Sequence, residues 1–245
     1  MFSRSDWYVT KQVKSKQRVA DHGEVFTAER EVKAMCDLVA QECERIDSRF
    51  LEPACGDGNF LAEILRRKLA VVKRVYGKSA YDYEKNAVLA VTNIYGVDIM
   101  HDNVDACRAR LFDIWNKEYT KVCKADANDE AREAVKYILS QNILYGNALS
   151  LMTVDENQED TDIPIIFPEW SFITNTPFIK RRDFRFDVLL KENDEEENYM
   201  QYSLFADDAT NSEFWDFDPV TNEQIPKPIK EYAQIHYRRV FEYGN

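Results

Sequence analysis

An α/β fold with a mostly parallel sheet is the architecture that this 245-residue sequence predicts. Short β-favouring segments alternate along the chain with longer segments in which apolar residues recur at helical spacing. The short segments end at polar or glycine-containing turns, which interrupt regular structure. Since parallel neighbours need right-handed crossovers, we expect helices on both faces of the sheet. Hydrophobic residues make up 44% of the chain, enough for a sizeable core.

The expected elements follow one another in strand–helix order. We expect strands at 49–52, 93–97, 142–145 and 171–174. Helices are expected from Thr27, as an N-cap, to about Cys43, and at 60–75, 83–92, 103–119, 130–139 and 182–190. In this prediction a polar N-terminal arm covers 1–24, the α/β domain covers 25–190, and an acidic tail covers 191–245.

Composition argues against several classes of protein. The five cysteines form no C-x-x-C pair and the three histidines are far apart, so no metal site is expected. No apolar run approaches the ~20 residues that span a bilayer, and residues 1–16 are polar and basic, unlike a secretory signal. A cytoplasmic protein is therefore expected. The net charge of −12 argues against a protein that coats DNA uniformly, although basic clusters leave a local basic face open.

A glycine turn after the first strand is the most informative segment. Glu52 ends the strand, and Gly56 and Gly58 precede an amphipathic helix. Glycines adopt positive φ and let a ligand approach the backbone. The helix N-terminus offers free N–H groups to a carboxylate or phosphate. The segment indicates a ligand site, and a tight strand-to-helix turn without a ligand is the alternative.

Two further strand ends carry polar residues. Asp98 ends the second strand, where a carboxylate can accept both ribose hydroxyls of an adenosine. An exposed Asp that caps the next helix is the alternative. Asn147 follows the third strand, where its amide oxygen could contact the amino edge of adenine. An ordinary turn is the alternative there.

The fourth strand end carries a segment suited to an exocyclic amino group. The Asn175 side chain and the Thr176 carbonyl can accept its hydrogen bonds, and Phe178 can stack on a flipped base. A strand-ending turn is the alternative. Because ligands of parallel sheets bind beyond the carboxyl ends of the strands, all four segments are expected to meet at one edge.

These four segments, in this order, resemble the S-adenosylmethionine (SAM)-dependent adenine-N6 DNA methyltransferases of restriction–modification systems. The match covers about 18–178, and 51–60 is similar to the SAM-binding motif almost residue for residue. The resemblance implies a Rossmann-like methyltransferase fold and SAM as cofactor. The SAM-binding residues that it implies are Phe26, Thr27, Glu52, Pro53, Ala54, Gly56, Asp57, Gly58, Asp98, Ile99, Asn147 and Ala148. The implied catalytic residues are Asn175, Thr176, Pro177 and Phe178.

The chain departs from that family at three places. Thr176 replaces the first proline of the catalytic motif, and Asn147 stands where the family usually has Asp. Only residues 179–245 follow the motif, where the family has further strands and a target-recognition domain. We therefore expect a sheet short of its C-terminal strands, and DNA recognition through a partner specificity subunit.

The basic cluster beside the catalytic motif is a candidate DNA contact, with a solvated helix start as the alternative. It consists of Lys180, Arg181, Arg182 and Arg185. The leading hypothesis is a SAM-dependent methyltransferase that modifies adenine in DNA, within a modification or phage-defence system. The alternative is a catalytically degenerate SAM-binding structural or regulatory subunit. Methylation of a protein glutamine or of RNA is a weaker third hypothesis.

Overall fold

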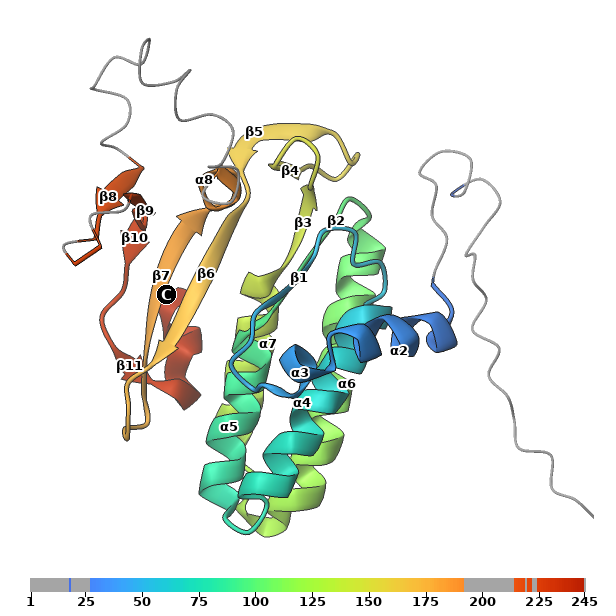
Figure 1. Ribbon diagram of the computed structural model, residues 1–245, viewed down its shortest axis with the longest axis vertical. Helices are drawn as coiled ribbons and strands as arrows, with labels where there is room; N and C mark the ends of the chain where they lie inside the picture. The colour runs from blue at the N-terminus through green and yellow to red at the C-terminus, as the bar shows by residue number, and fades with distance from the viewer. Residues whose placement is uncertain (1–17, 19–26, 192–213, 219, 222–223, 245) are drawn as a thin grey trace, which may run out of the picture.

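The computed structural model describes residues 18, 27–191, 214–218, 220–221 and 224–244. These residues form a mixed α/β structure in which a five-stranded sheet lies between a layer of helices and a long β-hairpin (Figure 1). The helices are α2 (Glu29–Leu38), α3 (Ala40–Glu44), α4 (Asn59–Tyr76), α5 (Ala80–Thr92), α6 (His101–Cys123), α7 (Asp129–Asn142), α8 (Phe186–Lys191) and the 3-10 segments η1 (Lys124–Asp126) and η2 (Tyr237–Gly244). The strands are β1 (Phe50–Glu52), β2 (Ile94–Asp98), β3 (Ile143–Asn147), β4 (Met152–Val154), β5 (Asp160–Pro164), β6 (Ile166–Phe172), β7 (Phe178–Arg185), β8 (Trp215–Phe217), β9 (Gln224–Pro226), β10 (Lys230–Glu231) and β11 (Ile235–His236). In the described part of the chain, no helix is both long and apolar enough to cross a membrane.

The parallel part of the sheet consists of β1, β2 and β3, in that order. Helices α4 and α5 connect β1 to β2, and α6 and α7 connect β2 to β3. Helix α4 is amphipathic, and it buries Leu61, Leu65 and Leu69 at helical spacing. The side chains of Ser79 and Asn128 cap α5 and α7. The predicted α/β class and the first three strands are confirmed.

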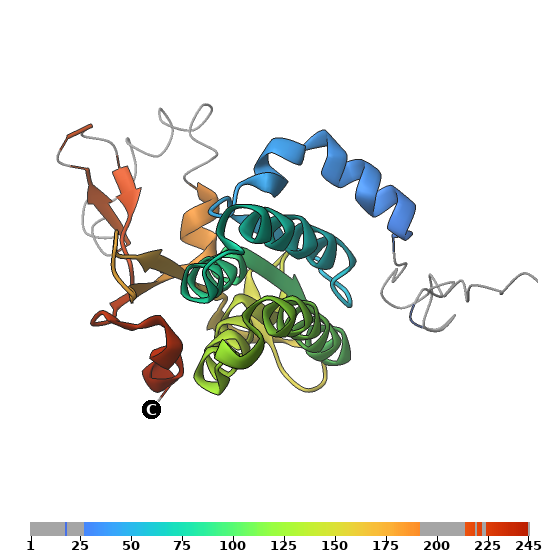
Figure 2. The ribbon, with the colours of Figure 1, turned by 90° about the horizontal axis from the view of Figure 1, so that it is seen from below.

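Helices α4, α5, α6 and α7, seen from below in Figure 2, share one core with Ile94 and Ile143 of the sheet, so they pack on the same face. Helix layers were predicted on both faces, but in the described chain the other face carries only the short α8. Ile94 of β2 belongs to the core beneath these helices, whereas Tyr95 and Val97 pack with Phe167 and Phe186 on the opposite face. Right-handed crossovers that proceed in one direction along a sheet place their helices on the same face. The first part of the β6–β7 hairpin and the short α8 cover the opposite face through Phe167 and Phe186, whereas Trp170 and Ile179 of the hairpin pack against the helices.

The sheet is mixed rather than mostly parallel, because the chain continues after β3 in antiparallel pairs. Strands β4 and β5 extend the sheet beyond β3, and both pairings are antiparallel. Strand β6 pairs with β7, which also pairs with β10 and β11. The predicted helix at 182–190 is half strand, since β7 continues to Arg185 and α8 begins at Phe186. Ile179, Arg181 and Asp183 are buried at alternate positions, which is the period of a strand.

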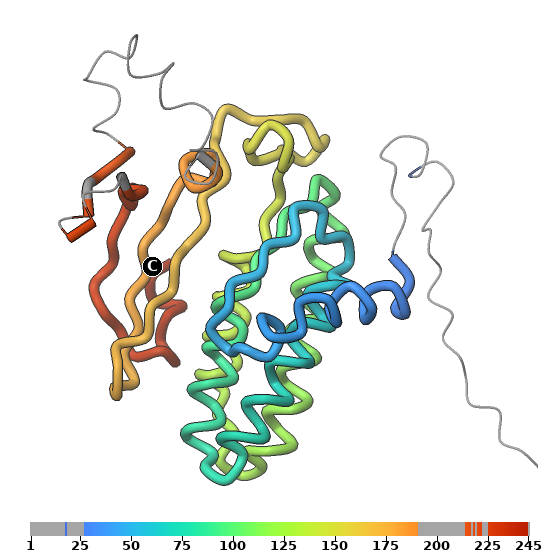
Figure 3. Tube along the Cα trace, viewed as in Figure 1, coloured from blue at the N-terminus to red at the C-terminus, as the bar shows by residue number. Residues whose placement is uncertain are grey.

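Strand β6 runs in the direction opposite to β1, β2 and β3 (Figure 3). Ile165, just before β6, lies against Gly146 near the carboxyl end of β3. Further along β6, the Trp170 indole Nε1 donates a hydrogen bond of 2.8 Å to Asn142 at the amino end of β3. The predicted strand at 171–174 is thus the last part of β6, and it points toward the amino ends of the parallel strands.

A buried carboxylate connects the C-terminal segment to the helices. Glu84 of α5 is 1% exposed, and it accepts a hydrogen bond from the Tyr119 hydroxyl of α6. Its other oxygen accepts hydrogen bonds from the Tyr237 hydroxyl and from Arg238 Nε, both at 2.5 Å. Segment η2 therefore packs on the helical layer through a satisfied polar cluster.

Candidate cofactor site

The glycine turn joins β1 to α4 at the carboxyl end of the parallel strands. Gly56 and Gly58 have φ angles of 53° and 86°, in the left-handed region that favours glycine. A Cβ atom at Gly58 would lie 2.6 Å from Sγ of Cys107 on α6, so a side chain there would displace the buried thiol. Glycine is therefore favoured at position 58 by its positive φ and by its close packing against Cys107. At position 56 only the positive φ favours glycine.

Two thiols that the sequence analysis did not single out support this turn. Cys55 and Cys107 are both buried. A hydrogen bond with Cys107, together with burial, raises the pKa of the Cys55 thiol far above its ordinary value. The Cys55 thiol therefore stays protonated, and both side chains pack as small apolar groups. No spacing rule could reveal this pair, because its members come from different elements.

Asp98 holds the glycine turn from the neighbouring strand. One carboxylate oxygen accepts a hydrogen bond from the Gly56 N–H at 2.8 Å. The other accepts hydrogen bonds from the Met100 N–H at 2.8 Å and the Asn103 side chain at 3.3 Å. A carboxylate offers about four acceptor positions. Asp98 therefore has capacity for about one further donor, not for two ribose hydroxyls.

Glu52, at the end of β1, is a partly buried carboxylate beside the turn. Burial raises the pKa of Glu52, and a hydrogen bond from the Ala54 backbone opposes the increase. Within the residues described, no basic side chain contributes to this pKa. A carboxylate that is partly removed from water and lacks a cationic neighbour is suited to a cationic group of a ligand.

The N-terminus of α4 opens onto the same turn. Its N-cap, Gly58, has no side chain that could accept a hydrogen bond, whereas α5 and α7 have polar side-chain caps. Arg110 of α6 donates hydrogen bonds to the Asn59 side chain at 2.7 Å and to the Asp57 carboxylate at 3.3 Å. Free N–H groups beside a guanidinium are suited to a ligand carboxylate. The sequence analysis did not include Arg110, which reaches the turn from a different helix.

Other residues in the predicted cofactor set lie near this edge. The Asn59 side chain donates a hydrogen bond of 3.3 Å to the Thr27 carbonyl, which places Thr27 beside the start of α4. Pro53 and Ala54 are exposed in the turn, and Ile99 directly follows Asp98. Phe26 lies outside the described residues.

Asn147 is occupied by the turn after β3. Its side-chain oxygen accepts a hydrogen bond from the Leu149 N–H, and its amide nitrogen donates to Asp160, both at 3.0 Å. Ala148 packs against the apolar cluster on the hairpin face. This geometry matches the alternative of an ordinary strand-end turn, because the amide groups that would contact adenine already have partners.

The predicted catalytic segment lies at the other end of the sheet, so the prediction that all four segments meet at one edge is wrong. The turn between β6 and β7 contains Asn175, Thr176 and Pro177, and Phe178 is the first residue of β7. Strand β6 has seven residues, so it carries the chain about 20 Å away from the carboxyl ends of β1–β3. Phe178 packs edge-on against His236, with ring centroids 6.3 Å apart. The antiparallel direction of β6 is the physical reason for the separation.

The predicted DNA-binding residues differ in their environments. Lys180 is exposed, but Arg181 is 7% exposed, which corrects its assignment as a DNA contact. Arg181 Nε lies 2.6 Å from the carboxylate of Asp183. Hydrogen bonds to carboxylates also engage Arg182, with Glu169 at 2.9 Å, and Arg185, with Asp187 at 2.7 Å. These intramolecular pairs reduce the positive charge that the cluster offers to phosphates.

Comparison with protein-family models, with curated proteins and with solved structures finds no match for the chain. Any assignment of chemistry to the edge with the glycine turn therefore rests on the residues of this chain alone. Glu52, Gly56 and Asp98 come together there as predicted from the order of the strands.

Proposed function

We propose that this chain is a SAM-binding module with a structural or regulatory role in a DNA-modification or phage-defence system. The observation that carries the proposal is the hydrogen bond between the Gly56 N–H and Asp98, which joins the glycine turn to the end of β2. The uncapped N-terminus of α4 and the carboxylate of Glu52 border the same place. The system named rests on the resemblance of 51–60 to the SAM-binding motif of DNA methyltransferases.

The polar groups at this edge correspond to the polar groups of SAM. The N–H groups of α4 and the guanidinium of Arg110 suit the methionine carboxylate. Glu52 suits the cationic ammonium and sulfonium end of the molecule. The remaining acceptor position of Asp98 suits one ribose hydroxyl.

Methyl transfer to adenine through Asn175 is not part of the proposal. The catalytic role implied by the resemblance requires Asn175 and Phe178 next to the SAM methyl group. Both residues lie beyond the amino ends of the parallel strands, where Trp170 already contacts Asn142. A partner protein would supply DNA recognition, because three of the four basic residues in the cluster are paired with acids.

Titration calorimetry with SAM tests the proposal. We expect one SAM per chain, and at least a tenfold loss of affinity in Asp98→Asn, because Asn cannot replace all the acceptor positions of Asp98. Asp113→Asn is the matched control, since Asp113 is an exposed carboxylate on α6. Circular dichroism melts establish that each variant is folded. Folded protein that gives no heat with SAM, or that binds ATP or NAD more tightly than SAM, would overturn the assignment.

A further inference from the structure

A cavity of about 420 Å³ lies on the hairpin face of the sheet, and none of the glycine-turn residues lines it. It is bounded by β1, β2, the β6–β7 hairpin, α8 and β9. Within the described chain β1 is an edge strand, paired only with β2, so the cavity lies beside an open sheet edge. Its volume is in the range of small-molecule sites.

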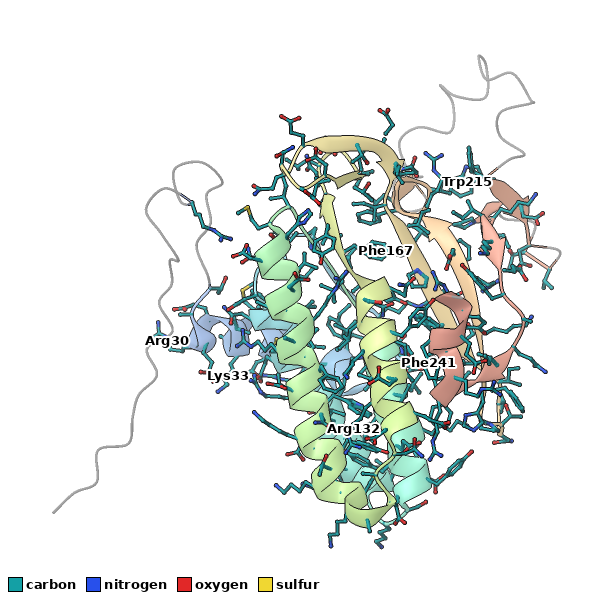
Figure 4. The ribbon with its side chains drawn as sticks, turned by 180° about the vertical axis from the view of Figure 1, so that it is seen from behind. Arg30, Lys33, Arg132, Phe167, Trp215 and Phe241 are labelled. Atoms are coloured by element: carbon teal, nitrogen blue, oxygen red, sulfur yellow. The ribbon has the colours of Figure 1, made fainter. Side chains whose placement is uncertain are left out.

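The inner wall of the cavity is aromatic. Tyr95 of β2 meets Phe167 of β6 edge to face, with ring centroids 5.5 Å apart. Phe167 meets Phe186 of α8 in the same way at 5.1 Å. Figure 4 shows Phe167 between the sheet and the hairpin. Such interlocked rings form a rigid apolar surface that suits another flat apolar group.

Three exposed apolar side chains converge on the mouth of the cavity. Leu51 of β1, Leu190 of α8 and Ile225 of β9 are 41%, 39% and 37% exposed. Each comes from a different element. A ligand in the cavity would remove part of all three side chains from water, which favours its binding.

One side of the cavity carries a net positive charge. Arg182 Nε donates a hydrogen bond of 2.9 Å to Glu169, and Arg49 is hydrogen-bonded to the same carboxylate. The Arg182 guanidinium lies 5.5 Å from the ring centroid of Phe184, another lining residue. The Arg49 side chain is 60% exposed. Two guanidinium groups share one carboxylate, so an anion is the complementary ligand group.

We propose that this cavity binds a flat apolar molecule that carries one anionic group, such as an aromatic carboxylate or sulfonate. Its apolar body lies against the aromatic wall, and its anionic group lies beside Arg49 and Arg182. The site does not depend on SAM, because the two sets of lining residues are different.

Fluorescence titration with two matched probes tests the proposal. Anilinonaphthalenesulfonate carries the anionic group, and phenylnaphthylamine has the same rings without it. We expect saturable binding of one sulfonate probe per chain, at least about tenfold tighter than that of the neutral probe. Arg49→Gln should reduce this preference at least threefold. Leu190→Trp, which fills the mouth, should weaken both probes more than tenfold.

Leu149→Trp is the matched control, because Leu149 is 96% exposed and does not line the cavity. Circular dichroism and unchanged SAM calorimetry in Leu190→Trp establish that the variant is folded and that the two sites are separate. Equal affinity for the two probes, or sulfonate binding that survives Leu190→Trp, would overturn the proposal. If neither probe binds and sedimentation shows a dimer that Leu51→Glu dissociates, the mouth of the cavity is instead an interface with a second copy of the chain.

Discussion

At the residue scale, the edge with the glycine turn combines a carboxylate that stabilises the fold, Asp98, with one that does not, Glu52. Asp98 accepts hydrogen bonds from the turn and from α6, so it supports the fold whether or not a ligand is present. Glu52 is different, because burial raises its pKa and its charge is poorly compensated. A carboxylate that lowers the stability of the free protein is expected at a place where it binds a ligand.

Glu52→Gln should make the free protein more stable at neutral pH and weaken SAM binding about tenfold. The pKa of Glu52 is raised in the folded protein above its ordinary value of 4.5. Its protonation therefore stabilises the fold fully below that value, and this stability is lost as pH rises through the folded pKa. Gln is neutral at every pH, so Glu52→Gln does not lose this stability as pH rises. The variant should therefore be more stable than the unmodified protein at neutral pH and about equally stable in acid. Urea unfolding between acid and neutral pH measures the difference.

Glu133→Gln is the control for this change, because Glu133 forms an exposed pair with Lys136 on α7. Its stability should follow that of the unmodified protein at every pH. A Glu52→Gln variant that is less stable at neutral pH, or that binds SAM normally, would contradict the role given to Glu52.

At the scale of elements, Asn142 connects helix, sheet and hairpin. This fully buried residue ends α7, and its amide nitrogen lies 3.1 Å from the Ile94 carbonyl at the start of β2. The same nitrogen contacts the carbonyls of Val91 and Thr92 at 3.4 and 3.3 Å. Its oxygen accepts the indole N–H of Trp170 from β6. This side chain thereby connects the hairpin to the parallel strands.

Asn142→Ala should lower the free energy of unfolding by about 2–3 kcal/mol, because it leaves the buried Trp170 N–H without an acceptor. Asn86→Ala is the control, since its hydrogen bond within α5 is exposed, and about 0.5 kcal/mol or less is expected. Denaturant unfolding followed by fluorescence measures both. In a double-mutant cycle with Trp170→Phe, a coupling energy near zero would show that the Asn142–Trp170 bond does not hold the hairpin.

At the scale of the whole molecule, the two ends of the sheet have different neighbours. The carboxyl ends of β1 and β2 border the glycine turn and α4. The amino ends border the hairpin turn at 173–177 and the C-terminal η2, where the Tyr237 N–H donates to the Pro177 carbonyl at 2.9 Å. A ligand at one end is therefore separated from the hairpin turn by the length of the sheet.

Asn175→Ala should leave SAM affinity within about twofold of the unmodified protein, because Asn175 lies at the opposite end of the sheet. Incubation with tritiated SAM and unmethylated DNA should give equal background label with either protein. Calorimetry and filter counting provide the two measurements. Label on DNA that disappears in Asn175→Ala would restore the catalytic role implied by the family resemblance.

Local sequence determined the first half of the molecule, from β1 through β3. Apolar residues at helical spacing specify α4, and Gly56 and Gly58 specify the turn because their positive φ angles suit glycine. The order of strands then brings Asp98 to that turn through right-handed crossovers. These features depend on neighbours in the chain, so a pattern can reveal them.

Only the tertiary structure decided the direction of β6, and with it the place of Asn175. A short β-favouring segment is equally suited to parallel and antiparallel pairing, and its direction depends on distant contacts. The Tyr95 hydroxyl donates to the Pro168 carbonyl, Arg49 pairs with Glu169, and Trp170 with Asn142. These partners lie between 28 and 120 positions apart in the chain. The residues around Asn175 carry no information about such distant contacts. The segment 175–178 could therefore be singled out from the sequence, but its position in the fold could not.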